Sequence, residues 1–392
     1  MEIPRGFLFN ALAAGIKKEG LDLGLIWSEK EAVAAATFTQ NVVKAAPVIL
    51  GHTFLEHGKR ARAILVNSGC ANACTGEDGL KDAEEILGAL ASITGTPVET
   101  ILPASTGVIG ERLPVNSIKE RLGELFSGLS PEKYEPFARA MMTTDTFPKI
   151  VSRRLALPSG LEGTILGFAK GAGMIAPNMA TMLAFVLTDL GGEKTFLQKT
   201  LQKAVEFSFN RITVDGDTST NDTVYLLANG LQGEMSGHQD QETFEEALQE
   251  LCQELARLIV KDGEGATKLV RVRLEGARTE AEALTLAKTV ANSLLVKTAF
   301  FGEDPNWGRI LAAMGRAGIN FDPYQVDIYI NQIQIVKNGL GKGKEAEGLA
   351  HQEMKKPEFI LTIKLKEGNS SAEVLTCDLS YEYVKINAEY RT

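Results

Sequence analysis

The residue best placed to act as a nucleophile is Thr181. The segment before it, Lys170 to Ala180, is rich in glycine, contains Pro177 and carries only the charge of its first residue. Glycine and proline disfavour regular structure, whereas Met182 to Thr188 is apolar, so the pattern predicts a loop that leads a threonine into a buried strand. A hydroxyl held at the end of a strained loop could attack the preceding carbonyl, that of Ala180.

Cleavage at that carbonyl would divide the chain into residues 1–180 and 181–392 and leave Thr181 with a free amine beside its hydroxyl. An α-amino group titrates near pH ~7.7 to 8.0, so the amine could serve as the base that a catalytic hydroxyl needs. The four histidines lie outside the Gly-rich and Thr-rich motifs, which leaves a Ser-His-Asp triad without a visible base. The alternative is an ordinary Gly/Pro turn followed by an ordinary strand residue.

The composition indicates a large globular protein. With 392 residues, 44% of them hydrophobic and 23% charged, the chain can form two lobes or one large sandwich and is neither disordered nor fibrous. The net charge of −9 and the lack of long Lys/Arg runs argue against nucleic acid and anionic membranes as partners, so small molecules fit better. No secretory signal and no run of roughly 18 apolar residues is visible, and we therefore expect a cytoplasmic protein.

The sequence predicts no metal and no cofactor. Four scattered cysteines are too few for a disulfide framework, and Cys70 and Cys74 have no second Cys/His pair at zinc-site spacing. The acidic segment Asp215 to Thr223 lacks the spacing of a calcium-binding loop. No phosphate-binding loop or dinucleotide fingerprint follows a predicted strand.

Hydrophobic periodicity predicts a mixture of strands and helices. Strands are expected at 24–27, 33–38, 63–66, 182–188 and 269–274, followed by antiparallel strands at 326–330, 359–365, 374–376 and 381–385. Helices are expected at 80–93, 131–142, 193–209, around 244–258 and at 280–296. Between the last helix and the final strands, Trp307 is expected to anchor packing, and Asp304 and Arg309 could form an ion pair.

Eight unusual motifs occur in one order along the chain. They are NSGCANACTG (67–76), PASTGVIG (103–110), MTTDTFPK (142–149), KGAGMIAPNMATMLAF (170–185), DGDTSTNDT (215–223), DGEGATK (262–268), FGEDPNWGRI (301–310) and INAEYRT (386–392). Together they closely resemble the arginine-biosynthesis N-acetyltransferase family, the glutamate N-acetyltransferase/ornithine acetyltransferase proteins. The resemblance runs nearly end to end, which makes it far more specific than any single motif.

The resemblance implies a role for particular residues. It makes Thr181 the nucleophile, freed by cleavage after Ala180, and it makes Thr106 and Gly107 the oxyanion hole. It assigns substrate contacts to Thr144, with Thr143 and Thr146 as secondary choices, and to Lys170, Glu264, Asn387 and Thr392, the last two on a tail that folds over the substrate. From spacing alone, PASTGVIG is a turn between Ile101 and a helix near Ser117, Glu264 is a solvated turn residue, and the tail is frayed.

The resemblance also implies a fold and an activity. The fold is an α/β (α+β) layered sandwich of the ornithine acetyltransferase type, built from both fragments, and the assembly is a heterotetramer of two alpha and two beta chains. The activity is acetyl transfer from N²-acetyl-L-ornithine to L-glutamate through an acetyl-threonine intermediate. Use of acetyl-CoA as a second acetyl donor stays open, because one-activity and two-activity members share these motifs. The alternatives are an amino-terminal-nucleophile amidase or peptidase and a non-enzymatic binding protein.

Overall fold

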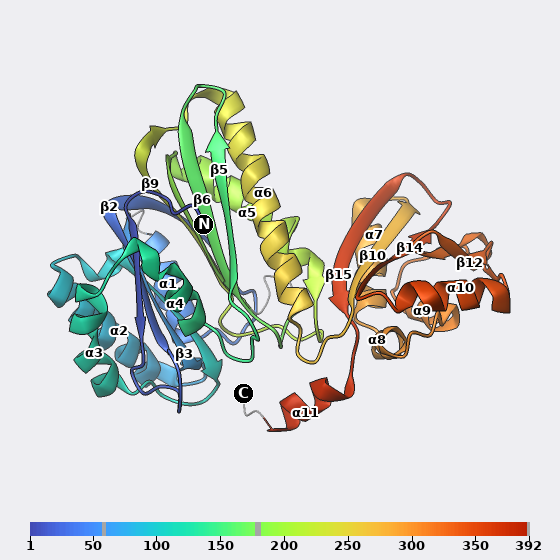
Figure 1. The fold of residues 1–392 in the computed structure, drawn as a ribbon, viewed down its shortest axis with the longest axis horizontal. Helices are drawn as coiled ribbons and strands as arrows, with labels where there is room; N and C mark the ends of the chain where they lie inside the picture. Colours follow the sequence, from blue (N-terminus) through green and yellow to red (C-terminus); the bar gives the residue numbers. More distant parts are fainter. Residues whose placement is uncertain (57–59, 177–181, 390–392) are drawn as a thin grey trace.

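The computed structural model describes residues 1–56, 60–176 and 182–389. Two mixed β-sheets, each covered by helices, form two lobes side by side (Figure 1). The predicted α+β layered fold is confirmed. None of the helices over these ranges is long and apolar enough to cross a membrane.

The first lobe contains an eight-stranded sheet in the order β4-β3-β2-β9-β7-β6-β5, with β1 paired to β2. The strands are β1 (Phe7–Leu12), β2 (Leu23–Phe38), β3 (Ala61–Cys70), β4 (Ile101–Val108), β5 (Lys149–Ala156), β6 (Glu162–Lys170), β7 (Leu183–Gly191) and β9 (Thr223–Glu234). The helices are α1 (Ala46–Glu56), α2 (Gly76–Thr94), α3 (Val115–Ser127), α4 (Tyr134–Ala140), α5 (Lys194–Glu206) and α6 (Gly237–Lys261), with short 3-10 turns at Val98–Thr100, Pro131–Lys133 and Phe209–Arg211.

Two predicted elements of this lobe need correction. The strands expected at 24–27 and 33–38 are halves of the single strand β2, which pairs with β3 up to Trp27 and again at Ala32, and with β9 from Val33. The register shift between Trp27 and Ala32 explains the apparent break. The helix expected at 131–142 is a 3-10 turn followed by the shorter α4.

The carboxyl end of one central strand of this sheet lies beside the amino ends of its neighbours, and we call this end of the sheet its central edge. All nine residues of β7 are buried, as an apolar run predicts for a strand covered on both faces. Strand β6 pairs antiparallel to β7 with Lys170 opposite Leu183, and β7 pairs parallel to β9 with Leu183 opposite Thr223. The carboxyl end of β6 therefore lies beside the amino ends of β7 and β9, and this edge includes segments from both sides of the predicted cleavage position.

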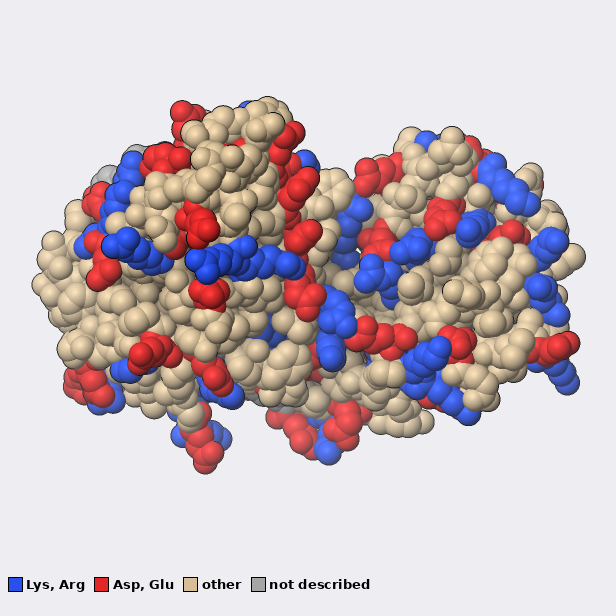
Figure 2. Space-filling view, turned by 45° about the horizontal axis from the view of Figure 1, so that its top comes forward, with Lys and Arg blue, Asp and Glu red and all other residues tan. Residues whose placement is uncertain are grey.

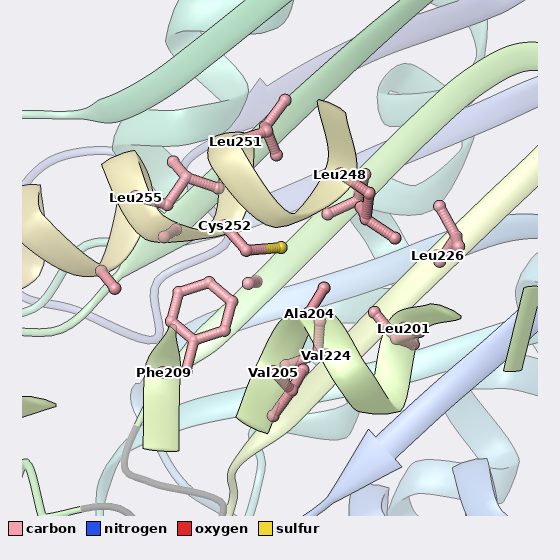
Figure 3. Packing of buried hydrophobic residues seen from close by; sticks show 14 of the residues in the cluster. Leu201, Ala204, Val205, Phe209, Val224, Leu226, Leu248, Leu251, Cys252 and Leu255 are labelled. Atoms are coloured by element: carbon pink, nitrogen blue, oxygen red, sulfur yellow. The ribbon is translucent and has the colours of Figure 1, made fainter. Parts of the chain in front are cut away.

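Helices α5 and α6 pack together on one face of the sheet (Figure 3). The predicted apolar stripe of the acidic helix lies within α6 and faces the core. Buried side chains from α6, α5 and the neighbouring segments form one hydrophobic cluster, which includes Leu201, Ala204, Val205, Phe209, Val224, Leu226, Leu248, Leu251, Cys252 and Leu255. Full burial of one such large side chain is worth about 1.5 to 3 kcal/mol, so this layer holds the sheet edge in place.

The second lobe contains a seven-stranded sheet in the order β13-β12-β11-β14-β10-β15-β8. Its strands are β8 (Ile212–Thr213), β10 (Leu269–Ala277), β11 (Asp327–Ile330), β12 (Ile333–Lys337), β13 (Leu340–Gly341), β14 (Glu358–Lys364) and β15 (Ser370–Cys377). Its helices are α7 (Glu280–Ala291), α8 (Leu294–Phe301), α9 (Trp307–Gly315), α10 (Lys344–Met354) and α11 (Tyr381–Glu389), with a 3-10 turn at Pro323–Gln325. The antiparallel pairing expected among the final strands is confirmed for β11 and β14, and β14 also pairs parallel to β10.

Two further expectations in this lobe are wrong. The helix expected at 280–296 is interrupted, because Ser293 is extended and separates α7 from α8. The strand expected at 381–385 is the start of helix α11, in which Asn387 donates to the Tyr383 carbonyl one turn earlier. The alternating tyrosines that suggested a strand are equally compatible with a helix that has no buried residue.

The predicted Asp304–Arg309 ion pair is also wrong. Arg309 donates to the Leu295 carbonyl at 2.9 Å, and Asp304 accepts from Asn306 at 2.9 Å. The expectation for Trp307 is confirmed, since it packs against the core of this lobe and its indole N–H donates to Glu347 at 3.1 Å.

Candidate active site

A cavity of about 200 Å³ lies where the central edge of the first sheet meets the segment that leads into the second lobe. Six residues assigned to the site from the sequence line it: Thr106, Gly107, Thr144, Lys170, Glu264 and Asn387. The other three, Ala180, Thr181 and Thr392, lie outside the described residues. Helix α11 runs beneath the junction of the lobes and brings Asn387 to the cavity (Figure 1). The fold therefore gathers positions that are up to 281 residues apart in sequence.

Thr106 and Gly107 lie near the end of strand β4, parallel to β3. The turn expected there is wrong, because PASTGVIG stays in the sheet as far as Val108. Gly107 has a φ of +130°, and a Cβ atom at this position would lie 2.3 Å from the carbonyl carbon of Gly69. Only glycine fits so close to the neighbouring strand, and this fixes the backbone beside the Thr106 hydroxyl.

Lys170 is the last residue of β6 and is 5% exposed. Its Nζ donates to Thr106 Oγ1 at 3.2 Å. Burial lowers the pKa of the Lys170 ammonium, and the negative charge of Asp145 opposes this lowering. Asp145 is held close by, since it accepts a hydrogen bond of 2.7 Å from the backbone N–H of Gly171.

Sequence reasoning missed a buried ionic network beside Lys170. The ammonium of Lys149 donates to Asp145 at 2.7 Å and to Asp262 at 2.6 Å, and all three side chains are almost fully buried. Burial raises the pKa of Asp145, but the charges of Lys170 and Lys149 and the Gly171 hydrogen bond outweigh it and bring the pKa to about 2. The network joins MTTDTFPK to DGEGATK, and membership in these two motifs was the only sequence signal for it.

The threonines of MTTDTFPK have different surroundings. Thr144 and Thr143 both line the cavity, and the backbone N–H of Thr143 donates to Asp145 at 3.0 Å. Thr146 instead gives its backbone N–H and its hydroxyl to Asp262. Its hydroxyl is thus engaged in the network, which leaves Thr144 and Thr143 as the threonines of this motif that line the cavity.

Glu264 is buried at the cavity wall and is not a solvated turn residue. Its carboxylate accepts a hydrogen bond of 2.7 Å from Asn387 on α11, and its backbone N–H donates to the Ala172 carbonyl at 2.9 Å. A Cβ atom at Gly173 would lie 2.4 Å from the Glu264 carboxylate, so the Gly-rich loop is shaped to admit this acid. The cavity consequently has a cation on one wall and a carboxylate on another.

Asp215 and Tyr383 are cavity residues that sequence reasoning did not select. Asp215 accepts the backbone N–H groups of Met174 at 2.5 Å and Ile175 at 2.8 Å, and the Tyr383 hydroxyl at 3.4 Å. Burial raises the pKa of Asp215, and burial together with the charge of Asp215 raises the pKa of Tyr383. Asp215 therefore ties the Gly-rich loop to helix α11.

Asp222 lies against the first described residue after Thr181. Its Oδ1 accepts the backbone N–H of Met182 at 3.0 Å, and its Oδ2 is buried without a hydrogen-bond partner among the described residues. Burial raises the pKa of Asp222 well above its usual range, which favours the neutral acid. Within the described ranges, no group of three or more His, Cys, Asp or Glu side chains is arranged to hold a metal ion.

The cavity has the chemistry to bind a small zwitterion. A buried lysine, two wall threonines, a buried glutamate and an amide can meet a carboxylate and an ammonium group, and their burial strengthens each contact. The fold and the cavity thus define a layered α+β protein with a polar site of amino-acid size, a class that includes small-molecule transferases and hydrolases.

The chain belongs to the ArgJ family, whose profile matches residues 8–392. It is 52% identical over 396 aligned residues to the arginine biosynthesis bifunctional protein ArgJ of Desulfotalea psychrophila, covering 100% of both chains. It is 46% identical over 399 aligned residues to the glutamate N-acetyltransferase of Methanocaldococcus jannaschii, covering 99% of this chain and 98% of the relative. A crystal structure of ArgJ from Bacillus halodurans matches with 42% identity and a TM-score of 0.51, covering 54% of this chain and 100% of the solved one. The predicted family is confirmed.

Proposed function

We propose that this protein transfers an acetyl group from N²-acetyl-L-ornithine to L-glutamate, giving L-ornithine and N-acetyl-L-glutamate in arginine biosynthesis. Family membership and the printed names of the relatives, which include glutamate N-acetyltransferase, support an acyltransferase. The observation that carries the proposal is that six residues from motifs far apart in the sequence line one cavity. A small-molecule site of this kind fits an amino-acid substrate.

The proposed reaction has two half-reactions. Thr181 Oγ attacks the acetyl carbonyl of acetylornithine, the Thr181 amine takes the hydroxyl proton, and the C–N bond breaks as ornithine leaves with that proton. The α-amine of glutamate then attacks the acetyl-threonine ester, and the Thr181 hydroxyl re-forms. In both steps Thr106 Oγ1 and the Gly107 N–H stabilise the oxyanion.

We assign the substrate contacts to the cavity walls. Thr144 and Lys170 would meet the α-carboxylate that donor and acceptor share, and Glu264, oriented by Asn387, would meet an ammonium group. Thr392 is proposed to complete the site, although it lies outside the described residues. A buried carboxylate with a fixed amide partner discriminates strongly, because a ligand that lacks the matching charge leaves it unpaired.

Self-cleavage between Ala180 and Thr181 is part of the proposal. Residues 181–392 make up about 54% of the chain, which equals the share covered by the whole B. halodurans chain. A separate chain of that length is what a family member cut at this position would give. We further propose a heterotetramer of two alpha and two beta chains in the cytoplasm, with no cofactor and with acetyl-CoA as a candidate second acetyl donor.

The test is to incubate purified protein with acetylornithine and glutamate and to quantify both products. We expect ornithine and N-acetylglutamate in equal amounts, and no free acetate. Ornithine and acetate released without glutamate would instead identify an amidase of related fold. A parallel incubation with acetyl-CoA and glutamate decides whether the second activity is present.

A further inference from the structure

The side chain of Lys170 ends on the Thr106 hydroxyl. Its Nζ lies 3.2 Å from Thr106 Oγ1, and the lysine is 5% exposed. An ammonium group has three N–H donors and no lone pair, so in this contact the lysine donates and the threonine oxygen accepts. The contact therefore determines how the hydroxyl can use its own proton.

The Thr106 proton is left available to a ligand. A hydroxyl has one proton and two lone pairs, and Lys170 occupies one of the lone pairs. Among the described residues, no acceptor takes the Thr106 proton in a hydrogen bond. Since Thr106 and Lys170 both line the cavity, the proton can point into it, and the neighbouring positive charge makes it a stronger donor.

Asp145 is fixed close to Lys170, and its negative charge favours the ammonium form of the lysine. Its Oδ1 accepts the backbone N–H of Gly171, the residue after Lys170, and also a hydrogen bond from the Lys149 ammonium. The groups that act on Lys170 are the acids Asp145, Glu264 and Asp222 and the ammonium groups of Lys149 and Lys17. Burial lowers the pKa of Lys170, and of these groups Asp145 opposes that lowering most strongly.

We propose that Lys170 acts mainly through Thr106: its ammonium, anchored beside Asp145, orients and polarises the hydroxyl that stabilises the oxyanion. The inference rests on the proposed transfer reaction and deepens it. Lys170 and Asp145 are positioning residues in this account, and the direct contact of Lys170 with a substrate carboxylate is secondary. Loss of the lysine then slows turnover more than it weakens substrate binding.

A double-mutant cycle tests the proposal. Thr106→Ala, Lys170→Met and the double variant are assayed for acetyl transfer, with rates expressed per cleaved molecule from denaturing gels. We expect Lys170→Met to lower kcat by about tenfold or more, and the double variant to be as slow as Thr106→Ala alone, within about threefold. Independent effects that multiply would overturn the proposal, because the lysine would then act without the threonine.

Ornithine binding provides a test that does not depend on turnover. Calorimetry compares Thr181→Ala with Thr181→Ala/Lys170→Met. The proposal predicts affinities within about threefold, since Thr144 also meets the substrate carboxylate and Lys170 acts chiefly on Thr106. A loss of about tenfold or more, roughly the energy of one charged contact, would overturn it.

The pH profile tests the role of Asp145. Burial lowers the Lys170 pKa, so kcat should fall on the alkaline side as the ammonium loses its proton. Asp145→Asn removes a charge that raises this pKa, and the alkaline limb should move to lower pH. Asp189→Asn is the matched control, because Asp189 is also buried and accepts backbone N–H groups but lies far along β7. An unmoved limb in Asp145→Asn would overturn this role, whereas a wild-type protein without transfer activity would contradict the proposed function itself.

Discussion

Two of the hollows that are lined by charged residues differ in how those charges are used. The larger, about 390 Å³, lies between α6 and the second sheet and includes Arg153, Arg211, Arg257, Arg271, Glu250 and Glu373. Each of these arginines pairs with a glutamate, as in Arg257–Glu358 at 2.5 Å and Arg153–Glu250 at 3.4 Å. The smaller, about 200 Å³, is the candidate active site, where Lys170 and Glu264 are buried at the cavity wall.

The candidate active site is thus distinguished from the larger hollow by the burial of its charges and not by its volume. Charges of both signs are intermingled over one face of the molecule, without a large patch of one sign (Figure 2). Exposed pairs of this kind contribute about 0 to 1 kcal/mol each. Buried charges such as Lys170 and Glu264 cost free energy to keep, so their presence needs a chemical reason or a full set of partners.

The largest difference should appear when a buried pair is broken. Lys149→Met leaves Asp145 and Asp262 buried without their cation, and we expect a loss of about 3 to 5 kcal/mol in the free energy of unfolding, measured with urea. The matched control is Lys119→Met, which removes an exposed pair with Glu85 and should cost less than about 1 kcal/mol. Equal losses in the two variants would show that burial makes no difference.

The next largest effect concerns the oxyanion hole. Thr106→Ala should lower kcat by about 10²-fold or more, because a donor to the developing negative charge is lost. Thr106→Ser keeps the hydroxyl and should retain most of the activity. Both variants should unfold at the wild-type denaturant concentration, since the Thr106 side chain is only partly buried. A Thr106→Ala enzyme with wild-type turnover would remove this residue from the mechanism.

A smaller effect is expected at the carboxylate wall. Glu264→Gln keeps the shape and the partner Asn387 but loses the charge, and KM for acetylornithine should rise by about tenfold, the value of one charged contact. The control is Glu382→Gln on the exposed side of α11, where Glu382 meets only Lys385 among the ion pairs of the described chain. Steady-state kinetics that cannot distinguish the two variants would argue against a substrate contact at Glu264.

The smallest effect is expected in the larger hollow. Arg257→Ala removes a pair with Glu358 that is partly exposed on both sides, and transfer activity should stay within about twofold of wild type. A thermal unfolding scan should show only a minor shift. A strong loss of activity in this variant would contradict this account and would show that the larger hollow takes part in acetyl transfer.

The sequence predicted the parts of the site that local pattern or motif resemblance can show. The apolar run after the Gly-rich loop predicted buried strand β7, and the motifs selected Thr106, Lys170 and Glu264 for one site, where the structure brings them together. The Lys149–Asp262 contact spans 113 residues and the Tyr383–Asp215 contact 168. Periodicity describes only neighbouring residues, so it could not find either contact.

Helix α11 shows the same limit from another side. Its segment has no buried residue, so no apolar face distinguishes helix from strand in the sequence. Its position is set by distant polar partners, Glu264 for Asn387 and Asp215 for Tyr383. Such a segment takes its structure from tertiary contacts, and these become visible only in the folded chain.

The measurement that tests the central claim most directly is the intact mass of the purified wild-type protein under denaturing conditions, before and after incubation with acetylornithine alone. The account predicts two polypeptides, residues 1–180 and 181–392, and one acetyl group added to Thr181 of the second. A single uncut polypeptide of 392 residues that transfers acetyl groups at full rate would contradict it.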